Sequence, residues 1–351
     1  MSVLDKVLSL RPGNVVARVG PGSRVPLLDP RELLGALEST PMALPCLPVL
    51  SKGALPGLLG AARAEDSVLG LSCPHPLADR GAPERFVLAV HAAAQEAEHT
   101  RPLFLQAGPL RVASTDADVL DALQEGLFRV VDAGFALVSL DLSRLTSYEA
   151  VEAVNALVGP LKERELSLEV SPPQLSSGGL VDACATLLEG LAQWQVPLRF
   201  LRVSDTQLGH GEPGAELDVE LLRRVVETAA AKGVAVAVAE DSTGPARGLS
   251  SYVAAGVRKV DRGGPFGPLA LRAWPPEVRD PVVARAQAAG MPAGELLSVL
   301  EEGLPPLAPA ARETLEALSF AEATEALGAL GAHRSASVAM AFLAKPGGDL
   351  G

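Results

Sequence analysis

Four carboxylates lie where short apolar runs of the sequence end. Asp141 and Glu169 close two such runs, and Glu240 and Asp241 directly follow a third. Carboxylates at the ends of buried strands suit general acid or base catalysis, or the binding of a divalent metal. We therefore take Asp141 and Glu169 as candidate catalytic residues. The alternative is that they only satisfy polar groups at the rim of a sheet.

His210 is a candidate metal ligand. It lies in a loop between Gly209 and Gly211, and its nearest candidate partners along the following strand are Glu240 and Asp241. One imidazole with two carboxylates is an acceptable ligand set for zinc or another divalent ion. The sequence does not show that these side chains converge. A hydrogen-bonded loop histidine is the alternative.

Two nucleophile candidates have weaker support. Cys73 and His75 pair a thiol with an imidazole, but residues two apart in a loop rarely form a working nucleophile and base. Lys259 lies on an expected strand, and a Schiff-base mechanism needs a desolvated lysine. For both, the structural interpretation is preferred.

Ser242, Gly263 and Gly264 are candidate ligand-binding residues. Gly263 and Gly264 precede an expected helix, and the backbone amides of such a loop can bind an anion. The alternative is a tight turn, for which glycine is equally suited. The sequence does not decide between an anion-binding loop and a tight turn.

The elements that must position these residues follow a repeated pattern. Eight short apolar runs recur, most of them followed by an amphipathic helical pattern, which is typical of repeated βα units. Eight parallel strands that need cover on their outer face close most simply into a (β/α)8 TIM barrel. The runs are 43–49, 67–72, 102–107, 136–141, 166–170, 198–203, 234–239 and 257–260.

The chain divides into three expected parts. Residues 1–24 are punctuated by Gly and Pro and form an N-terminal extension, and residues 25–275 form the barrel. The strand pattern then stops, and residues 276–351 form a C-terminal helical region. We expect all eight βα units to be complete before that region.

Charge and composition exclude some partners and locations. The 351-residue chain has a formal net charge of -12 and no basic cluster, so neither nucleic acid nor an anionic membrane surface is expected as a partner. Its three cysteines have no zinc or disulfide spacing. With no signal peptide and no apolar stretch of spanning length, a cytoplasmic location is expected.

Several segments of the sequence resemble the class II ketose-bisphosphate aldolases, which include the fructose- and tagatose-bisphosphate enzymes. They are similar to that family's fourth strand with its loop, its fifth strand, the loop after its sixth strand, and its eighth strand. In order, these segments are 133–151, 166–175, 208–211 and 257–261. The resemblance covers roughly residues 25–273 and implies a TIM barrel.

The resemblance also implies a chemistry, namely aldol cleavage in which a divalent metal polarises a ketose carbonyl. The family's catalytic Asp and metal-binding His after the third strand match Gly108 and Pro109 here. Another metal-binding His matches Ala239, so His210 alone is retained among the metal histidines. None of the three replacements can ligate a metal or transfer a proton through its side chain.

The phosphate-binding positions differ as well. Glu240 and Asp241 lie where the family has a glycine-rich phosphate loop, and carboxylates repel phosphate. The family's acidic-Thr-acidic loop after the eighth strand reads Asp-Arg-Gly-Gly-Pro at 261–265. Arg144 replaces a His, and Ser171 replaces a carboxylate.

These losses predict a non-catalytic structural, regulatory or partner-binding barrel, with no cofactor. The alternative is a metal-dependent aldolase or lyase, with a remodelled site around His210 that holds an ion such as zinc. We expect a homo-oligomer, and a protein partner under the first hypothesis. At the barrel mouth we expect Arg144 or Arg262 to pair with carboxylates and leave a narrow pocket.

Overall fold

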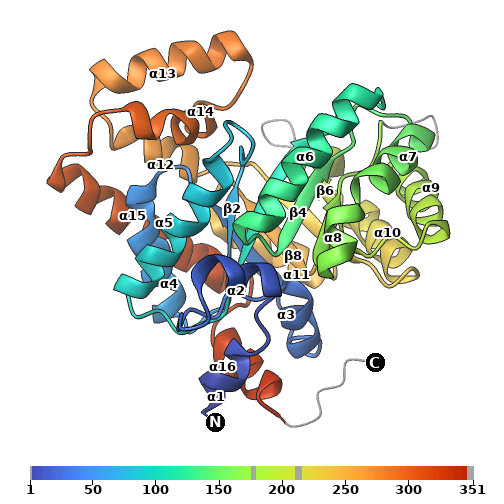
Figure 1. Cartoon of the computed structure of the whole chain (residues 1–351), viewed down its shortest axis with the longest axis horizontal. Coiled ribbons are helices and arrows are strands. Elements are labelled where there is room, and N and C mark those ends of the chain that lie inside the picture. The colour runs from blue at the N-terminus through green and yellow to red at the C-terminus, as the bar shows by residue number, and fades with distance from the viewer. Residues whose placement is uncertain (1, 175–178, 210–215, 346–351) are drawn as a thin grey trace.

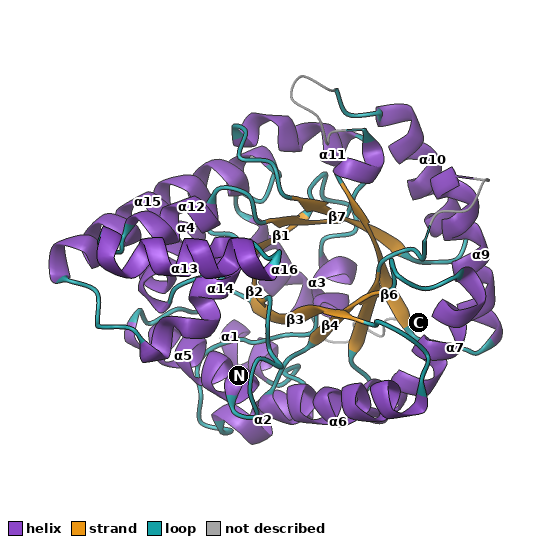
Figure 2. Cartoon of the chain, turned by 90° about the horizontal axis from the view of Figure 1, so that it is seen from above, coloured by secondary structure: helices purple, strands orange, loops and turns teal. Residues whose placement is uncertain are grey.

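The computed structural model describes residues 2–174, 179–209 and 216–345. Eight parallel strands form a closed barrel in sequence order, with helices around it (Figure 2). This confirms the predicted (β/α)8 TIM barrel. The strands are β1 (Leu44–Pro48), β2 (Leu69–Cys73), β3 (Leu103–Arg111), β4 (Leu137–Asp141), β5 (Ser167–Val170), β6 (Leu198–Ser204), β7 (Ala235–Glu240) and β8 (Lys259–Arg262).

Strand register decides which side chains enter the barrel. Side chains on a strand alternate between the two faces, and residues paired across parallel strands point to the same side. Lys259 pairs with Ala237, and Asp261 pairs with Ala239 and with Cys46. Lys259 and Asp261 both point into the barrel, because they contact residues of other strands across its interior.

Helices on the outside cover the strands. α6 ends where Gly134 adopts a left-handed conformation, and α10 begins with Asp218 as its cap. The outer helices up to β8 are α4 (Leu55–Ala64), α5 (Ala82–Glu96), α6 (Ala117–Ala133), α7 (Ser147–Leu157), α8 (Gly159–Arg164), α9 (Gly179–Gln193), α10 (Val219–Ala230) and α11 (Ser250–Ala254).

The N-terminal residues belong to the lower end of the barrel, where the strands begin. They form α1 (Val3–Leu8), α2 (Gly13–Val19) and α3 (Pro30–Ala36). The buried amide of Asn14 donates hydrogen bonds to two carbonyls beside α6. Asp29, the cap of α3, accepts hydrogen bonds from Ser167 at the start of β5, and α3 is seen through the barrel in Figure 2.

The chain after β8 contributes to both ends of the barrel. α12 (Phe266–Arg272), α13 (Pro276–Ala289) and α14 (Ala293–Leu300) form the lobe at the upper left of Figure 1. The long helix α15 (Pro309–Ala329) then packs against α4 and β1. Last, α16 (Ser335–Leu343) packs against α1 and α3 at the lower end.

α15 completes the wall of the barrel. A side chain at Gly57 on α4 would approach the Glu316 carbonyl to 2.2 Å, so the two helices are in backbone contact there. The wall therefore extends past residue 275. The boundary expected there marks the end of the strand pattern, while residues 276–308 form a helical insertion before the last wall helix.

The described residues contain no helix that is both long and apolar enough to cross a membrane. Their core is built chiefly from aliphatic side chains. The few large exceptions include Phe104, Phe135 and Phe200, all fully buried.

Candidate functional site

Four charged side chains form an ion-pair network inside the barrel, supplied by β5, β6 and β8. The Nζ atom of Lys259 lies 2.7 Å from Glu169 Oε2 and 2.6 Å from Asp261 Oδ1. The Nε atom of Arg202 lies 3.2 Å from Asp261 Oδ2. The Ser139 hydroxyl donates a 2.8 Å hydrogen bond to the other oxygen of Glu169. Two cations and two carboxylates thus neutralise one another in the interior.

The network holds Lys259 and Asp261 in their charged forms. Burial alone would lower the pKa of Lys259, but the carboxylates of Asp261 and Glu169 outweigh burial and hold that pKa above its usual range. Burial alone would raise the pKa of Asp261, but Lys259 and Arg202 hold it below its usual range. Lys259 is therefore an ammonium without a free lone pair, which makes it a poor Schiff-base nucleophile.

The end of β3 has no room for a side chain. Gly108 has a φ of +94°, and a Cβ built there would lie 2.5 Å from the Leu110 nitrogen and 2.6 Å from the Ser139 carbonyl oxygen. The register between β3 and β4 shifts at this point, so the backbone itself is irregular. The local backbone therefore requires glycine at position 108, and glycine has no side chain that could bind a metal or transfer a proton.

Glu240 lies on the outer face of the barrel. Arg262, beside it on β8, donates to Glu240 at 2.7 Å and to Glu322 of α15 at 2.8 Å. Burial raises the pKa of Glu240 to about 7, although Arg262 opposes this shift. Asp241, one residue further on, lines the cavity at the barrel mouth instead. Glu240 thus lies on the outer side of the barrel wall, and Asp241 lies on the inner side.

Asp141 stabilises the turn that follows β4. Its carboxylate accepts hydrogen bonds from the Ser143 amide at 3.0 Å and the Ser171 hydroxyl at 3.2 Å. Burial opposes the net lowering of its pKa, which comes chiefly from the bonds with Ser143 and Ser171. Glu169 is fully buried, and neither carboxylate lines the cavity.

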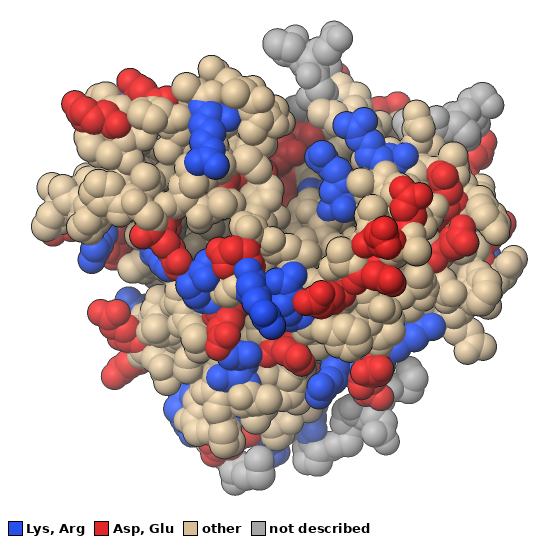
Figure 3. Space-filling view, turned by 45° about the horizontal axis from the view of Figure 1, so that its top comes forward, with Lys and Arg blue, Asp and Glu red and all other residues tan. Residues whose placement is uncertain are grey.

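A cavity of about 430 Å³ opens at the mouth, above the ion-pair network. Figure 3, in which this face comes forward, shows a hollow rimmed by acidic and basic side chains. Strand ends form its floor, and α12 and the start of α14 form one side. Its lining is Pro48, Leu50, Ser72, Pro74, Gln106, Gly108, Pro109, Arg202, Asp241, Asp261, Gly263, Gly264, Gly267, Pro268, Leu271 and residues 292–295.

The expected narrow pocket is not what the structure contains. Neither Arg144 nor Arg262 lines the cavity: Arg144 is exposed, and Arg262 faces α15. The arginine that pairs with carboxylates at the mouth is Arg202. The space at the mouth therefore stays open.

Of the three candidate ligand-binding residues, Ser242 and Gly264 have local structural roles. The hydroxyl of Ser242 accepts a 2.9 Å hydrogen bond from the Gly244 amide, and Ser242 is absent from the cavity lining. A Cβ at Gly264 would lie 2.1 Å from the Ser242 carbonyl oxygen, so glycine permits close packing of the two loops. Gly263 and Gly264 both line the cavity.

Cys73 and His75 do not form a reactive pair. Burial raises the pKa of the Cys73 thiol to about 12, so it stays protonated at neutral pH. The Nε2 atom of His75 lies 2.8 Å from Glu295 of α14. His75 thus connects the loop after β2 to the helix that borders the cavity.

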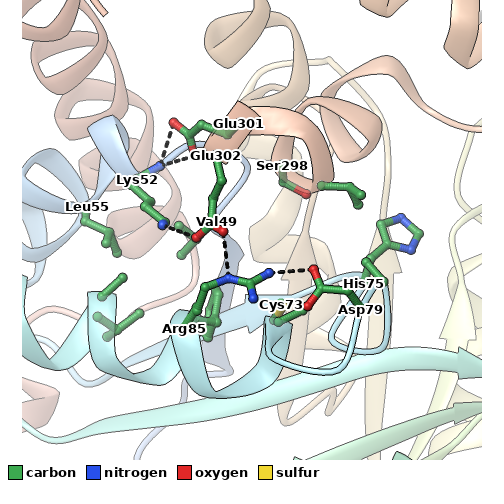
Figure 4. A pocket seen from close by; sticks show the side chains of 16 residues that line it. Val49, Lys52, Leu55, Cys73, His75, Asp79, Arg85, Ser298, Glu301 and Glu302 are labelled. Atoms are coloured by element: carbon green, nitrogen blue, oxygen red, sulfur yellow. Dashed lines mark hydrogen bonds and ion pairs between the residues drawn. The ribbon is translucent and has the colours of Figure 1, made fainter. Parts of the chain in front are cut away.

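Ion pairs also anchor the end of α14, around a second cavity of about 70 Å³ (Figure 4). Glu302 contacts Lys52 at 2.8 Å and Arg85 of α5 at 2.7 Å, and Arg85 also reaches Asp79. Glu301 accepts a 2.9 Å hydrogen bond from the Lys52 amide. These contacts connect the helical insertion to the barrel and so help to position α14.

His210 lies outside the described residues, so the structure gives no distance between it and Glu240 or Asp241. Among residues 2–174, 179–209 and 216–345, no three His, Cys, Asp or Glu side chains lie close enough to hold a metal. For Glu240 and Asp241, the opposite orientations described above separate the two carboxylates.

Sequence reasoning found Asp241, Gly263 and Gly264 but missed other polar residues that line the cavity. Arg202, Gln106 and Ser72 were not among the candidates, although all three lie on expected strands. The available signal was a polar residue inside an apolar, fully covered strand, which requires a partner or a function. Arg202 gives that signal most clearly.

No protein-family model matches the sequence, and neither does any curated protein. Solved structures do match. They include the YdjI aldolase from Escherichia coli K12 (TM-score 0.58, 13% identity, 87% of this chain and 97% of that chain). A putative fructose-1,6-biphosphate aldolase from Coccidioides immitis matches with a TM-score of 0.59 and 16% identity, over 88% and 97% of the two chains. Fructose-bisphosphate aldolase from Campylobacter jejuni matches with a TM-score of 0.60 and 15% identity, over 87% of this chain and 94% of that chain. The chain therefore shares the fold of these aldolases.

Proposed function

We propose that this chain is a class II aldolase-like barrel without aldolase chemistry, which acts as a ligand- or partner-binding protein. The observation that carries this proposal is the ion-pair network. Lys259, Arg202, Glu169 and Asp261 neutralise one another inside the barrel, and Glu240 pairs with Arg262 on its outer face. Lys259 and Asp261, which this pairing holds in their charged forms, are poorly suited to transfer a proton.

The end of β3 gives independent support. In the related aldolases, the resemblance implies a catalytic Asp and a metal-binding His at the positions of Gly108 and Pro109. The close contacts around Gly108 leave no space for such a carboxylate. At the position of the catalytic Asp this chain thus has a glycine that the backbone requires, and at the position of the metal ligand it has a proline.

The test is an assay of aldol cleavage with fructose 1,6-bisphosphate and tagatose 1,6-bisphosphate, in the presence of zinc, cobalt or manganese. We expect no cleavage above the rate without protein. Turnover that depends on the added metal and disappears in His210→Ala would contradict the proposal.

A second candidate is a metal-dependent lyase with a remodelled site at the mouth. Asp241 favours it, because its side chain lines the cavity and accepts no hydrogen bond from any described residue. Under this hypothesis His210 and Asp241 bind zinc or a similar ion. Stoichiometric metal in the purified protein, reduced in both Asp241→Asn and His210→Ala, would favour this candidate over the first.

A further inference from the structure

The mouth cavity contains buried polar groups whose hydrogen-bonding capacity is not used. Ser72 and Gln106 are 7% and 1% exposed, and both line the cavity. Among the described residues, nothing pairs with the Ser72 hydroxyl or the Gln106 amide nitrogen; the Gln106 oxygen accepts only the Cys46 thiol, at 3.4 Å. Neither atom is sealed in the interior; both are open to the cavity, so a polar occupant of the cavity can pair with them.

Arg202 adds a charged donor to the same lining. Its Nε atom contacts Asp261, while its two terminal nitrogens have no acceptor among the described residues. With the Gln106 amide nitrogen, they offer several N–H donors on the floor of the cavity. An oxygen atom of a ligand, such as a carbonyl or hydroxyl, would satisfy them.

The charge of the lining selects against anions. Among the described residues of the lining, three carboxylates, those of Asp241, Asp261 and Glu295, face one guanidinium, that of Arg202. Beneath the lining, Lys259 and Glu169 neutralise each other, and His75 beside Glu295 adds at most one positive charge. The cavity is therefore negative on balance, so a positively charged ligand gains energy there and a phosphate loses it.

Asp241 is the carboxylate best placed to bind that charge. Its side chain accepts no hydrogen bond from a described residue, whereas Asp261 is paired with both Lys259 and Arg202. Burial raises the pKa of Asp241; Arg202 opposes this shift, and the neighbouring carboxylates of Asp205, Glu295 and Asp261 add to it. A bound cation would relieve that repulsion.

The rest of the lining is apolar. Leu50, Leu271 and several prolines surround the polar floor, and the volume lies in the range of small-molecule sites, about 300–1,000 Å³. We propose that this cavity binds a small organic cation whose ammonium group contacts Asp241, whose oxygen contacts Arg202 and Gln106, and whose short apolar body fills the space between. This inference rests on the proposed binding function.

The experiment is a titration of the full chain by isothermal calorimetry with the amides of alanine, valine, leucine and phenylalanine. Each probe has an ammonium group, a carbonyl oxygen and an apolar body of graded size. For the leucine skeleton, the comparison set is leucinamide, zwitterionic leucine, neutral 4-methylpentanamide and anionic 4-methylpentanoate. We expect saturable binding of at least one amino amide, weaker binding of the neutral compound and the zwitterion, and none of the anion.

Variants place the binding in the cavity. Asp241→Asn should weaken binding roughly tenfold or more, the usual worth of a hydrogen bond to a charged group. Gln106→Met keeps the side-chain size and should also weaken it. Asp182→Asn on α9, where Asp182 is exposed, makes the same charge change away from the cavity and should leave binding unchanged.

The inference is wrong if no amino amide binds, if 4-methylpentanoate or fructose 1,6-bisphosphate binds at least as tightly, or if Asp241→Asn binds like the parent chain. These outcomes leave the absence of aldol cleavage untouched. Conversely, metal-dependent cleavage of a bisphosphate would overturn the proposed function whatever the calorimetry gives.

Discussion

Lys259 Nζ lies 2.7 Å from Glu169 Oε2, and neither side chain is exposed to solvent. Removing two charges from water costs several kcal/mol for each ion, and the attraction between them repays this only when both partners are present. Asp261 and Ser139 complete the hydrogen bonding of the pair. Loss of one partner should therefore cost more than loss of both.

We expect Lys259→Met to destabilise the protein by roughly 3–5 kcal/mol, because Glu169 is then a buried carboxylate without its partner. The double variant Lys259→Met/Glu169→Leu should recover part of this loss. Urea unfolding of the parent, the two single variants and the double variant measures the coupling. Strictly additive losses would show that the two side chains do not stabilise each other.

The strands of this barrel could be predicted, because each is a short apolar run that needs cover on its outer face. All eight expected runs overlap observed strands, from 43–49 with β1 to 257–260 with β8. The partners of Lys259 could not be predicted, since Glu169 lies 90 residues away and the two meet only when the barrel closes. Local pattern carries no information on that contact.

The orientations of the Glu240 and Asp241 side chains could not be predicted from the sequence either. Glu240 and Asp241 are neighbours in the sequence, and only the register of β7 against β8 shows that Glu240 faces Arg262 outside the barrel. The wall helix α15 was assigned to an appended region because 46 residues of other helices and turns, 263–308, separate it from β8. Chain order alone does not show that it returns to pack against α4.

A side chain introduced at the end of β3 should destabilise the fold. Gly108→Ala places a Cβ 2.5 Å from the Leu110 nitrogen, in a conformation with φ of +94°. The strained backbone alone costs about 1–3 kcal/mol, and the contact adds to it. Chemical denaturation should show a loss of at least that size.

Gly108→Asp carries the same strain and should remain without aldolase activity. Gly179→Ala, at a positive φ but with nothing within 4 Å of the added Cβ, is the control for backbone strain alone. If Gly108→Ala were no more destabilised than Gly179→Ala, the close contacts would not be the reason for the glycine.

His99 should make the fold sensitive to mild acid. It is 2% exposed, and burial, with the nearby Arg101 and Arg63, lowers its pKa to about 4. The unfolded chain binds the proton near pH 6.5, so the stability that His99 contributes is complete above that pH and is lost as the pH falls towards 4. The loss at pH 4 is on the order of 3 kcal/mol.

His99→Leu should flatten the stability profile between pH 6.5 and 4. His333→Gln, at a side chain that is 63% exposed, is the control and should keep the slope of the parent. Stability is measured by urea unfolding at intervals of half a pH unit. An unchanged slope in His99→Leu would assign the acid sensitivity to other groups.

The last prediction concerns α15, which packs against α4 and β1 and buries Leu315, Ala323 and Leu327. A chain ending at residue 308 keeps all eight strands but exposes the apolar face of α4 and the gap beside β8. Since a parallel barrel needs cover over every strand, we expect this chain to lose cooperative thermal unfolding and to expose apolar surface to a hydrophobic dye. A chain ending at residue 345 keeps α15 and α16 and should unfold like the parent. A sharp, reversible transition in the 308-residue chain would show that the barrel is complete without α15, and that residues 309–345 are an appendage after all.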